Sequence, residues 1–166
     1  TYHNGKMKRI SPEADQVWYV NSFGDFVMTG TNTTTYQVKG SSANRNLQTG
    51  VASGAFSSKK AYFKDGNAYL IEGSYSGLNI YEQNGSGDWH FRNRITAVAL
   101  CKEIEVDNNG CIWVQHERCG IYKVKLNEDL TDLEEIKAFT EIGNERNRIF
   151  FLFKINGAIC VYNGSE

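Results

Sequence analysis

The sequence predicts an all-β protein built from one repeated antiparallel sheet. Its 166 residues include nine tyrosines, nine phenylalanines and sixteen glycines, with Pro12 as the one proline. Aromatic and β-branched residues favour strands, and glycine favours the tight turns between them. The second observation is an internal repeat of a few tens of residues, and the third is the alternation of apolar and polar residues along much of it.

The repeat consists of a glycine-containing turn followed by a short apolar strand. It occurs in NSFGDFVMT (21–29), FKDGNAYLI (63–71), VDNNGCIWV (106–114) and FKINGAICV (153–161). By subtraction, the turn glycines Gly24, Gly66, Gly110 and Gly157 are 42, 44 and 47 positions apart. This spacing is close to the length of a four-stranded β-propeller blade. Each glycine stands where a hairpin turn needs positive φ.

A second glycine-led strand keeps the same register in the two middle units. Gly77 and Gly120 are 43 positions apart by subtraction, and Tyr69 and Trp113 are 44 apart. We therefore expect an all-β, β-propeller fragment of about three and a half four-stranded antiparallel blades. The expected single partial domain spans 1–166, with approximate units 16–48, 59–93, 99–140 and 148–166, the last one truncated.

The strands expected within these units follow the apolar alternation. In the third unit they are 99–106, 111–116, 120–126 and 135–140; in the second they are 61–64, 67–72, 78–83 and 89–92. The first unit has 16–20, 25–29, 34–39 and a faint outer strand near 45–48, and the last has 148–155 and 158–162. The acidic, leucine-rich segment 127–137 is interpreted as a connection into an outer strand rather than a helix. Because an incomplete ring leaves strand edges unpaired, the isolated segment is expected to self-associate or to be marginally stable.

Charge and hydropathy exclude several partners. Eighteen basic residues stand against nineteen acidic ones, so no broad positive surface is expected to bind nucleic acid. No run of about 20 apolar residues exists, so the segment itself is not expected to contact a membrane. The four cysteines, Cys101, Cys111, Cys119 and Cys160, lack the paired spacing of a zinc site. Ordinary thiols are favoured, and a disulfide between Cys111 and Cys119 remains an alternative in an oxidising compartment.

The acidic residues of the third unit allow chemical alternatives to a purely structural role. Asp107, Asn108 and Asn109 precede Gly110, but the acidic ligands and closing glutamate of an EF-hand are missing, so no metal is expected. Glu103, Glu105 and Asp107 alternate along a strand, a pattern that a glycosidase could use and that any solvent-facing strand also has. No phosphate loop or nucleophile elbow occurs. We therefore expect no cofactor and no catalysis by this segment.

Candidate binding residues lie in loops. Trp18, Tyr69 and Trp113 could stack on sugars, but we interpret them as equivalent strand positions that fill the space between blades. Loops on a rigid scaffold tend to carry function, and the loops between second and third strands emerge on one face of a propeller. The candidate ligand-binding residues are therefore Asn32, Tyr75, His116 and Arg118.

Two stretches, AYFKDGNAYLIEGSYSGLNIYEQ (61–83) and VDNNGCIWVQHERCGIYKVKLN (106–127), resemble the repeat of bacterial sensor propellers. In that family an aspartate-containing turn and a glycine precede a strand with an aromatic residue, and a second glycine opens the next strand. Such propellers form the extracytoplasmic, periplasmic part of inner-membrane hybrid two-component regulators and of membrane-spanning transcriptional regulators. The resemblance implies a non-catalytic sensor segment whose parent carries a kinase or DNA-binding output.

The ligand that the resemblance suggests is an oligosaccharide or another small molecule. Further partners are the remaining blades of the parent or a second copy of the segment. Two alternatives stay open at this point: a carbohydrate-active enzyme built on a propeller, and a purely structural protein-interaction repeat. Acidic and histidine side chains converging on one face would favour the enzyme, and loops rich in aromatic and turn residues favour binding.

Overall fold

The chain folds into strands and tight turns. The computed structural model describes residues 2–7, 9, 15–46, 54–118, 120–142, 145–146 and 150–163. Within these ranges no residue is helical, and there is accordingly no helix long and apolar enough to cross a membrane.

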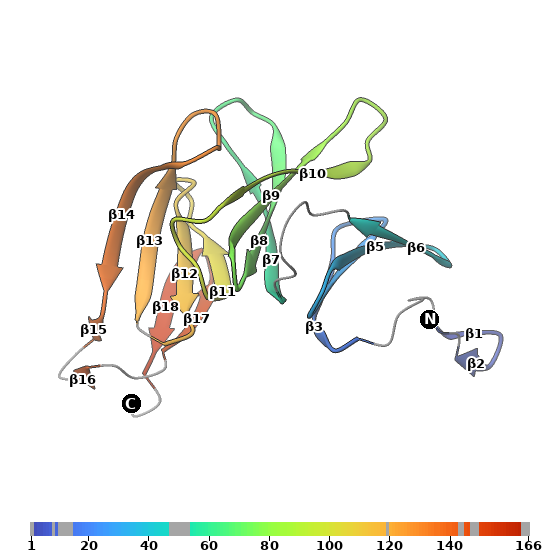
Figure 1. Cartoon of the computed structure of the whole chain (residues 1–166), viewed down its shortest axis with the longest axis horizontal. Coiled ribbons are helices and arrows are strands. Elements are labelled where there is room, and N and C mark those ends of the chain that lie inside the picture. The colour runs from blue at the N-terminus through green and yellow to red at the C-terminus, as the bar shows by residue number, and fades with distance from the viewer. Residues whose placement is uncertain are drawn as a thin grey trace.

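Three four-stranded antiparallel sheets follow one another along the chain, each with its strands side by side in sequence order (Figure 1). Sheet 1 contains β3 (Val17–Ser22), β4 (Val27–Thr31), β5 (Thr35–Lys39) and β6 (Ser42–Asn46). Sheet 2 contains β7 (Ala55–Tyr62), β8 (Ala68–Ser74), β9 (Gly77–Gln83) and β10 (Trp89–Ile95). Sheet 3 contains β11 (Cys101–Val106), β12 (Ile112–His116), β13 (Ile121–Leu126) and β14 (Leu133–Phe139).

Three two-stranded pairs complete the described chain. Sheet 4 is the pair β17 (Phe151–Ile155) and β18 (Ala158–Tyr162), which lies against β11 and β12. The other two pairs are β1 (Tyr2–His3) with β2 (Lys6–Met7), and β15 (Glu141–Ile142) with β16 (Glu145–Arg146).

The first strands of the successive sheets form the inner edge of the arrangement. β7 contacts β3 on one side and β11 on the other, and β11 in turn contacts β17. Consecutive four-stranded meanders that meet along their first strands are the architecture of a β-propeller. The expected all-β propeller fragment is therefore confirmed.

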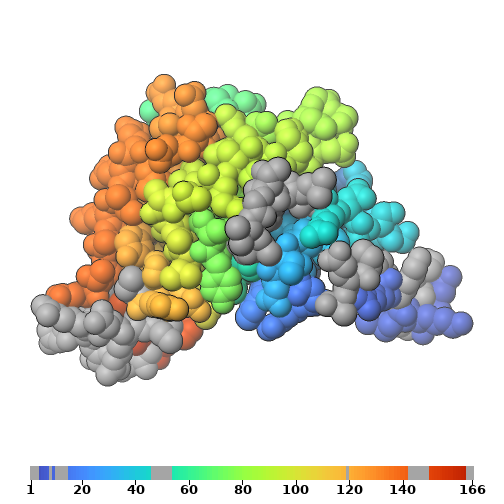
Figure 2. Space-filling model, viewed as in Figure 1, coloured from blue at the N-terminus to red at the C-terminus, as the bar shows by residue number. Residues whose placement is uncertain are grey.

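Apolar side chains fill the joints between neighbouring sheets. The first joint, between sheets 1 and 2, buries Tyr19 and Met28 against Leu70 and Tyr81. The second and largest joint, between sheets 2 and 3, holds Ile71, Leu78, Ile80, Ile104, Ile112, Val114 and Val124. The third joint packs Leu152 of sheet 4 against Ile121 of sheet 3. Figure 2 shows sheet 2, in green, filling the space between sheet 1, in blue, and sheet 3, in orange.

The first joint also contains a fully buried carboxylate. Glu72 accepts hydrogen bonds from Tyr19 Oη at 2.6 Å, Asn79 Nδ2 at 2.8 Å and Tyr81 Oη at 2.8 Å, and from Thr35 Oγ1. Burial and the neighbouring Glu72 charge raise the pKa of Tyr19 well above its usual value. Since Tyr19 and Thr35 come from sheet 1, this carboxylate links the two sheets.

The repeated turns have left-handed glycines. Gly24, Gly66, Gly110 and Gly157 have φ of 76°, 77°, 78° and 83°, and each lies between the first and second strands of its sheet. In the β11–β12 turn, Asp107 Oδ1 accepts the amides of Asn109 at 2.9 Å and Cys111 at 3.0 Å. The side chain of Asp107 therefore stabilises the turn itself.

The strand boundaries differ most from expectation in β7. This strand begins at Ala55 rather than near residue 61, because Ser57 and Ser58, which lie outside the strands expected from the sequence, are buried in the sheet. Ser57 Oγ accepts the amide of Ile104 at 3.0 Å, which joins β7 to β11. Residues 127–132 form a turn, and β14 then begins at Leu133, so the segment 127–137 is the expected connection.

Candidate ligand-binding site

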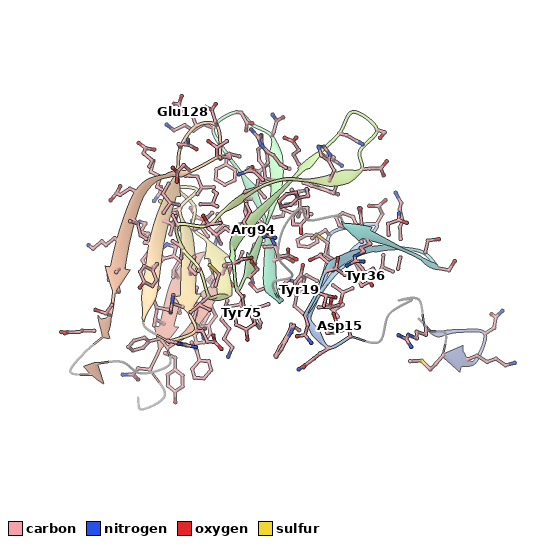
Figure 3. All side chains as sticks on the ribbon, viewed as in Figure 1. Asp15, Tyr19, Tyr36, Tyr75, Arg94 and Glu128 are labelled. Carbon is pink, nitrogen blue, oxygen red and sulfur yellow. The ribbon has the colours of Figure 1, made fainter. Side chains whose placement is uncertain are left out.

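The turns between second and third strands bring the predicted loop residues to one end of the sheets. Asn32 lies in the β4–β5 turn, Tyr75 in the β8–β9 turn, and His116 and Arg118 at the β12–β13 turn. Tyr75 marks this end in Figure 3, and Glu128 marks the opposite end.

Backbone hydrogen bonds tie the two middle turns to the connections between sheets. The amide of Tyr75 donates to Gly54 O at 3.1 Å, and the amide of Leu100 donates to Tyr75 O at 2.9 Å. The amide of Glu117 donates to Leu100 O at 3.0 Å. The loops at this end are thus held on a rigid base.

Three aromatic rings and one amide form what we call the aromatic cluster, namely Trp18, Phe56, Tyr75 and Asn32. Trp18 Nε1 donates to Asn32 Oδ1 at 2.6 Å. The ring of Phe56 stands edge-on to both neighbours, 5.1 Å from Trp18 and 4.5 Å from Tyr75. Phe56 is buried, whereas Trp18 and Tyr75 are 39% and 38% exposed. The cluster thus presents two ring surfaces to solvent from a buried base.

The structure divides the four predicted binding residues into two groups. Asn32 and Tyr75 meet in the aromatic cluster, through Trp18 and Phe56. His116 and Arg118 form a separate group on sheet 3, where the amide of Arg118 donates to His116 Nδ1 at 3.1 Å. Burial lowers the pKa of His116, and the Arg118 charge acts in the same direction while Glu117 opposes it.

A hollow of about 580 Å³ opens beside the aromatic cluster. Trp18 and Phe56 form part of its wall. The remaining lining comes from β11, β12 and sheet 4: Lys102, Glu103, Gln115, Phe151, Leu152, Phe153 and Tyr162. The hollow therefore combines several aromatic rings with a few polar groups.

Glu103 is the carboxylate of the hollow. Burial raises its pKa, and the nearby Lys59 ammonium partly offsets this effect. Lys59 Nζ lies 3.5 Å from Glu103 Oε1 and 2.9 Å from Glu105 Oε1. The two glutamates were expected as a solvent-facing row, and they instead share one lysine across neighbouring first strands.

Trp18 was wrongly grouped with Tyr69 and Trp113. Those two lie on the second strands β8 and β12, whereas Trp18 lies on the first strand β3. Met28 is the equivalent residue of sheet 1, because it is the second residue of its second strand, as Tyr69 and Trp113 are. Met28 is buried in the first joint, whereas Trp18 contacts Phe56 and Asn32 in the aromatic cluster.

Asp15 is a site residue that no sequence signal marked. Its carboxylate accepts the Thr33 amide at 3.0 Å and Thr33 Oγ1 at 2.8 Å, so it fixes the β4–β5 turn beside Asn32. Desolvation, the largest effect, would raise its pKa, but hydrogen bonds from Thr31, Thr33 and Gln16 outweigh it and lower the pKa to about 2. Asp15 lies 18 residues before Thr33, so no local pattern in the sequence connects it with the turn that it stabilises.

A second hollow of about 480 Å³ lies at the opposite end, between sheets 2 and 3. Its rim carries ion pairs, including Lys125 Nζ to Glu134 Oε2 at 2.8 Å. Tyr62 is its exposed aromatic ring, and the Lys60 ammonium lies 5.4 Å from the centre of that ring. We place the candidate site beside the aromatic cluster, where Trp18 and three exposed rings of sheet 4 line one hollow.

The thiols and acidic groups offer no metal centre in the part of the chain that the structure describes. No group of three histidine, cysteine, aspartate or glutamate side chains there is arranged to hold a metal ion. Cys101, Cys111 and Cys160 are free thiols, and Cys119 lies outside the described residues. Cys111 precedes β12 at the end of that strand opposite the β12–β13 turn.

Comparison with known proteins supports the fold alone. No protein-family model matches the sequence, and no curated protein matches it. Among solved structures, the chain is similar to a GH43 glycoside hydrolase, described as an engineered enzyme with both endo-xylanase and exo-arabinofuranosidase activity. The TM-score is 0.51 at 12% sequence identity, and the match covers 88% of this chain and 36% of the hydrolase. The chain thus spans about a third of that enzyme's length, and the likeness agrees with the propeller-like arrangement of its sheets.

Proposed function

We propose that this chain is a non-catalytic, ligand-binding propeller segment and that its ligand is an oligosaccharide held beside the aromatic cluster. The observation that carries the proposal is the pair of exposed rings, Trp18 and Tyr75, that both contact Phe56, with Trp18 and Phe56 forming part of the wall of a hollow. Aromatic faces bind the apolar faces of sugar rings, and their large apolar surface contributes most of the contact.

The polar groups of the hollow suit sugar hydroxyls. Binding sites for small molecules are mostly apolar and contain a few placed polar groups that fix orientation. Glu103, Lys102 and Gln115 would supply such groups here. The volume also lies within the range of about 300–1,000 Å³ that is usual for such sites.

The rigidity of the cluster favours binding without a large entropic cost. The indole of Trp18 is held by its hydrogen bond to Asn32, and Phe56 contacts both exposed rings. Side chains that are already ordered lose little freedom when a ligand arrives. The same arrangement would select ligands whose sugar faces match two rings in fixed positions.

The wider role that we propose is sensing. The resemblance of residues 61–83 and 106–127 to sensor-propeller repeats supports an extracytoplasmic segment of a bacterial signal-transduction regulator, with the output in other parts of the parent protein. The similar hydrolase structure adds that a propeller-like scaffold of this kind is used by a protein acting on carbohydrate.

A carbohydrate-active enzyme is the second candidate, and Glu103 is the observation that favours it. Its raised pKa and its position in the hollow suit a proton donor, and Glu105 lies near it through Lys59. Glycosidases use two carboxyl groups on either side of the scissile bond. The shared lysine favours the binding interpretation, because it pairs both carboxylates with a charge of the protein.

Titration with defined oligosaccharides tests the proposal. Xylo-, arabino-, gluco- and manno-oligosaccharides would be added while tryptophan fluorescence and the thermal midpoint are recorded, since a ligand that binds the folded state raises its stability. We expect saturable binding of one class, weakened about tenfold or more in Trp18→Ala and Tyr75→Ala. Tyr62→Ala, which removes an exposed ring from the opposite hollow, is the matched control and should bind normally.

Two results would contradict the proposal. Equal weakening in Tyr62→Ala would show that the rings of the aromatic cluster have no special role. Release of new reducing ends, abolished in Glu103→Gln, would identify the enzyme instead.

A further inference from the structure

Gln115 is the buried polar side chain that lines the hollow beside the aromatic cluster. It is 5% exposed, and its Oε1 accepts the amide of Leu152 at 3.3 Å. This hydrogen bond fixes which end of the side-chain amide is the oxygen. In the part of the chain that the structure describes, no acceptor is bonded to Gln115 Nε2. Because a buried donor without a partner costs free energy, an acceptor on a bound molecule would be favoured here.

Glu103 places an acceptor beside this donor. The two residues are Cα partners in the β11–β12 ladder, and both line the hollow. Side chains at paired positions of an antiparallel sheet project from the same face, with their Cβ atoms about 4.5–5.5 Å apart. Lys59 Nζ lies 3.5 Å from Glu103 Oε1, so the carboxylate faces a charge of opposite sign. The hollow therefore contains a carboxylate that accepts and, next to it, an amide nitrogen that donates.

We propose that Glu103 and Gln115 together bind two adjacent hydroxyl groups of one sugar ring, an inference that rests on the proposed function. The ligand class is then an oligosaccharide with free vicinal hydroxyls. A hydroxyl can both donate and accept, so one hydroxyl donates to the Glu103 carboxylate and its neighbour accepts from Gln115 Nε2. Adjacent hydroxyls leave a sugar ring side by side, as the two side chains leave the sheet.

Other common sugar substituents fit this pair less well. The acetamido group of an N-acetylated sugar also contains a donor and an acceptor, but a trans amide directs its N–H and C=O in opposite directions. It therefore cannot reach both side chains at once. A phosphate or carboxylate would bring a like charge towards Glu103. A site that is built to hydrogen-bond a hydroxyl also discriminates strongly against analogues that lack it.

Isothermal titration calorimetry of the chain 1–166 with xylotriose, arabinotriose, cellotriose and mannotriose tests the pair. For the trisaccharide that binds, we expect Glu103→Gln and Gln115→Leu each to raise the dissociation constant by about tenfold or more. Glu105→Gln is the matched control, because Glu105 also pairs with Lys59, at 2.9 Å, and is not among the described residues that line the hollow. It should bind within about twofold of the unmodified chain.

A second measurement changes the ligand and leaves the protein unmodified, so it still decides if Gln115→Leu fails to fold by circular dichroism. The methyl glycoside of the same trisaccharide is compared with its analogue that lacks every 3-hydroxyl and so has no two adjacent hydroxyls. We expect the analogue to bind about tenfold more weakly or worse. In the folded variants, one of the two substitutions should cause no further loss with the analogue, because its hydroxyl is already absent.

The outcomes separate this inference from the proposed function. Weaker binding in Trp18→Ala, with normal binding in both Glu103→Gln and Gln115→Leu, would overturn the pair and leave the proposed function in place. An effect of Glu103→Gln alone would assign both hydroxyls to the carboxylate and would also overturn the pair. Equal binding of the methyl glycoside and its analogue would overturn it as well. Absence of binding for all four trisaccharides would overturn the proposed function, and this inference with it.

Discussion

Single polar side chains form hydrogen bonds between neighbouring sheets, whereas the backbone hydrogen bonds of the strands lie within each sheet. Glu72 is fully buried and accepts hydrogen bonds from four donors on three different strands. A buried carboxylate is tolerated when every lone pair has a partner, and losing that match is costly. The first joint therefore depends on a charge as well as on apolar packing.

Replacing Glu72 by glutamine should lower the free energy of unfolding by about 2–4 kcal/mol. The amide turns one acceptor into a donor that faces other donors, such as Tyr81 Oη. Urea denaturation measures the effect. Glu82→Gln is the control, since Glu82 pairs with Arg92 near the surface and should cost less than about 1 kcal/mol. Equal costs for the two variants would contradict the role given to Glu72.

Asp15 should give the protein an acid-sensitive contribution to stability. Its pKa is lowered from 3.8 to about 2 in the folded chain, so the contribution is complete above pH 3.8 and is lost as the pH falls towards about 2. The difference in thermal midpoint between the unmodified protein and Asp15→Asn should therefore shrink across this interval. A difference that stays constant from about pH 5 to about pH 2 would contradict the assignment.

At the scale of elements, the turns differ in how well they tolerate an alanine in place of glycine, although they share left-handed glycines. Gly110 and Gly120 have nearly equal φ, 78° and 75°. A Cβ on Gly110 would meet nothing within 4 Å, whereas a Cβ on Gly120 would lie 2.2 Å from Phe139 O. The two turns therefore differ in how closely neighbouring backbone approaches.

Gly110→Ala and Gly120→Ala form a matched pair that tests this difference. We expect the first to cost about 1 kcal/mol, the cost of a left-handed alanine. The second should cost about 3 kcal/mol or more, because backbone must also move. Chemical denaturation measures both, and equal costs would show that the approach of Phe139 O is unimportant.

At the scale of the whole molecule, the joints between sheets predict which strands resist local unfolding most. β8 and β9 of sheet 2 are buried along almost their whole length between two joints, whereas β14 is exposed along most of its length. Local opening is easiest where few apolar contacts are lost. Amide hydrogen exchange should therefore be slowest in β8 and β9 and fastest, among the strands of sheet 3, in β14. Uniform exchange across sheet 3 would contradict this order.

The sequence by itself determined the repeating elements of this protein. Turn glycines, polar turn residues and alternating strands are local signals, and they placed β12, β13 and β18 within one residue of their observed bounds. They also predicted the correct fold class, and they predicted that Asn32 and Tyr75 lie in loops at one end of the sheets. They could not indicate that Ser57 and Ser58 are buried, because that depends on the neighbouring first strands.

Only the tertiary structure decided the composition of the site. Trp18 meets Asn32, 14 residues away, and Phe56 joins them from the next sheet. Glu103 shares Lys59 across two first strands, and Glu72 collects donors from sheets 1 and 2. The repeated local pattern determines the strands and turns within each sheet. Which side chains meet between two sheets depends on how those sheets pack. That packing is set by contacts distant in sequence, for which a single sequence holds no local signal.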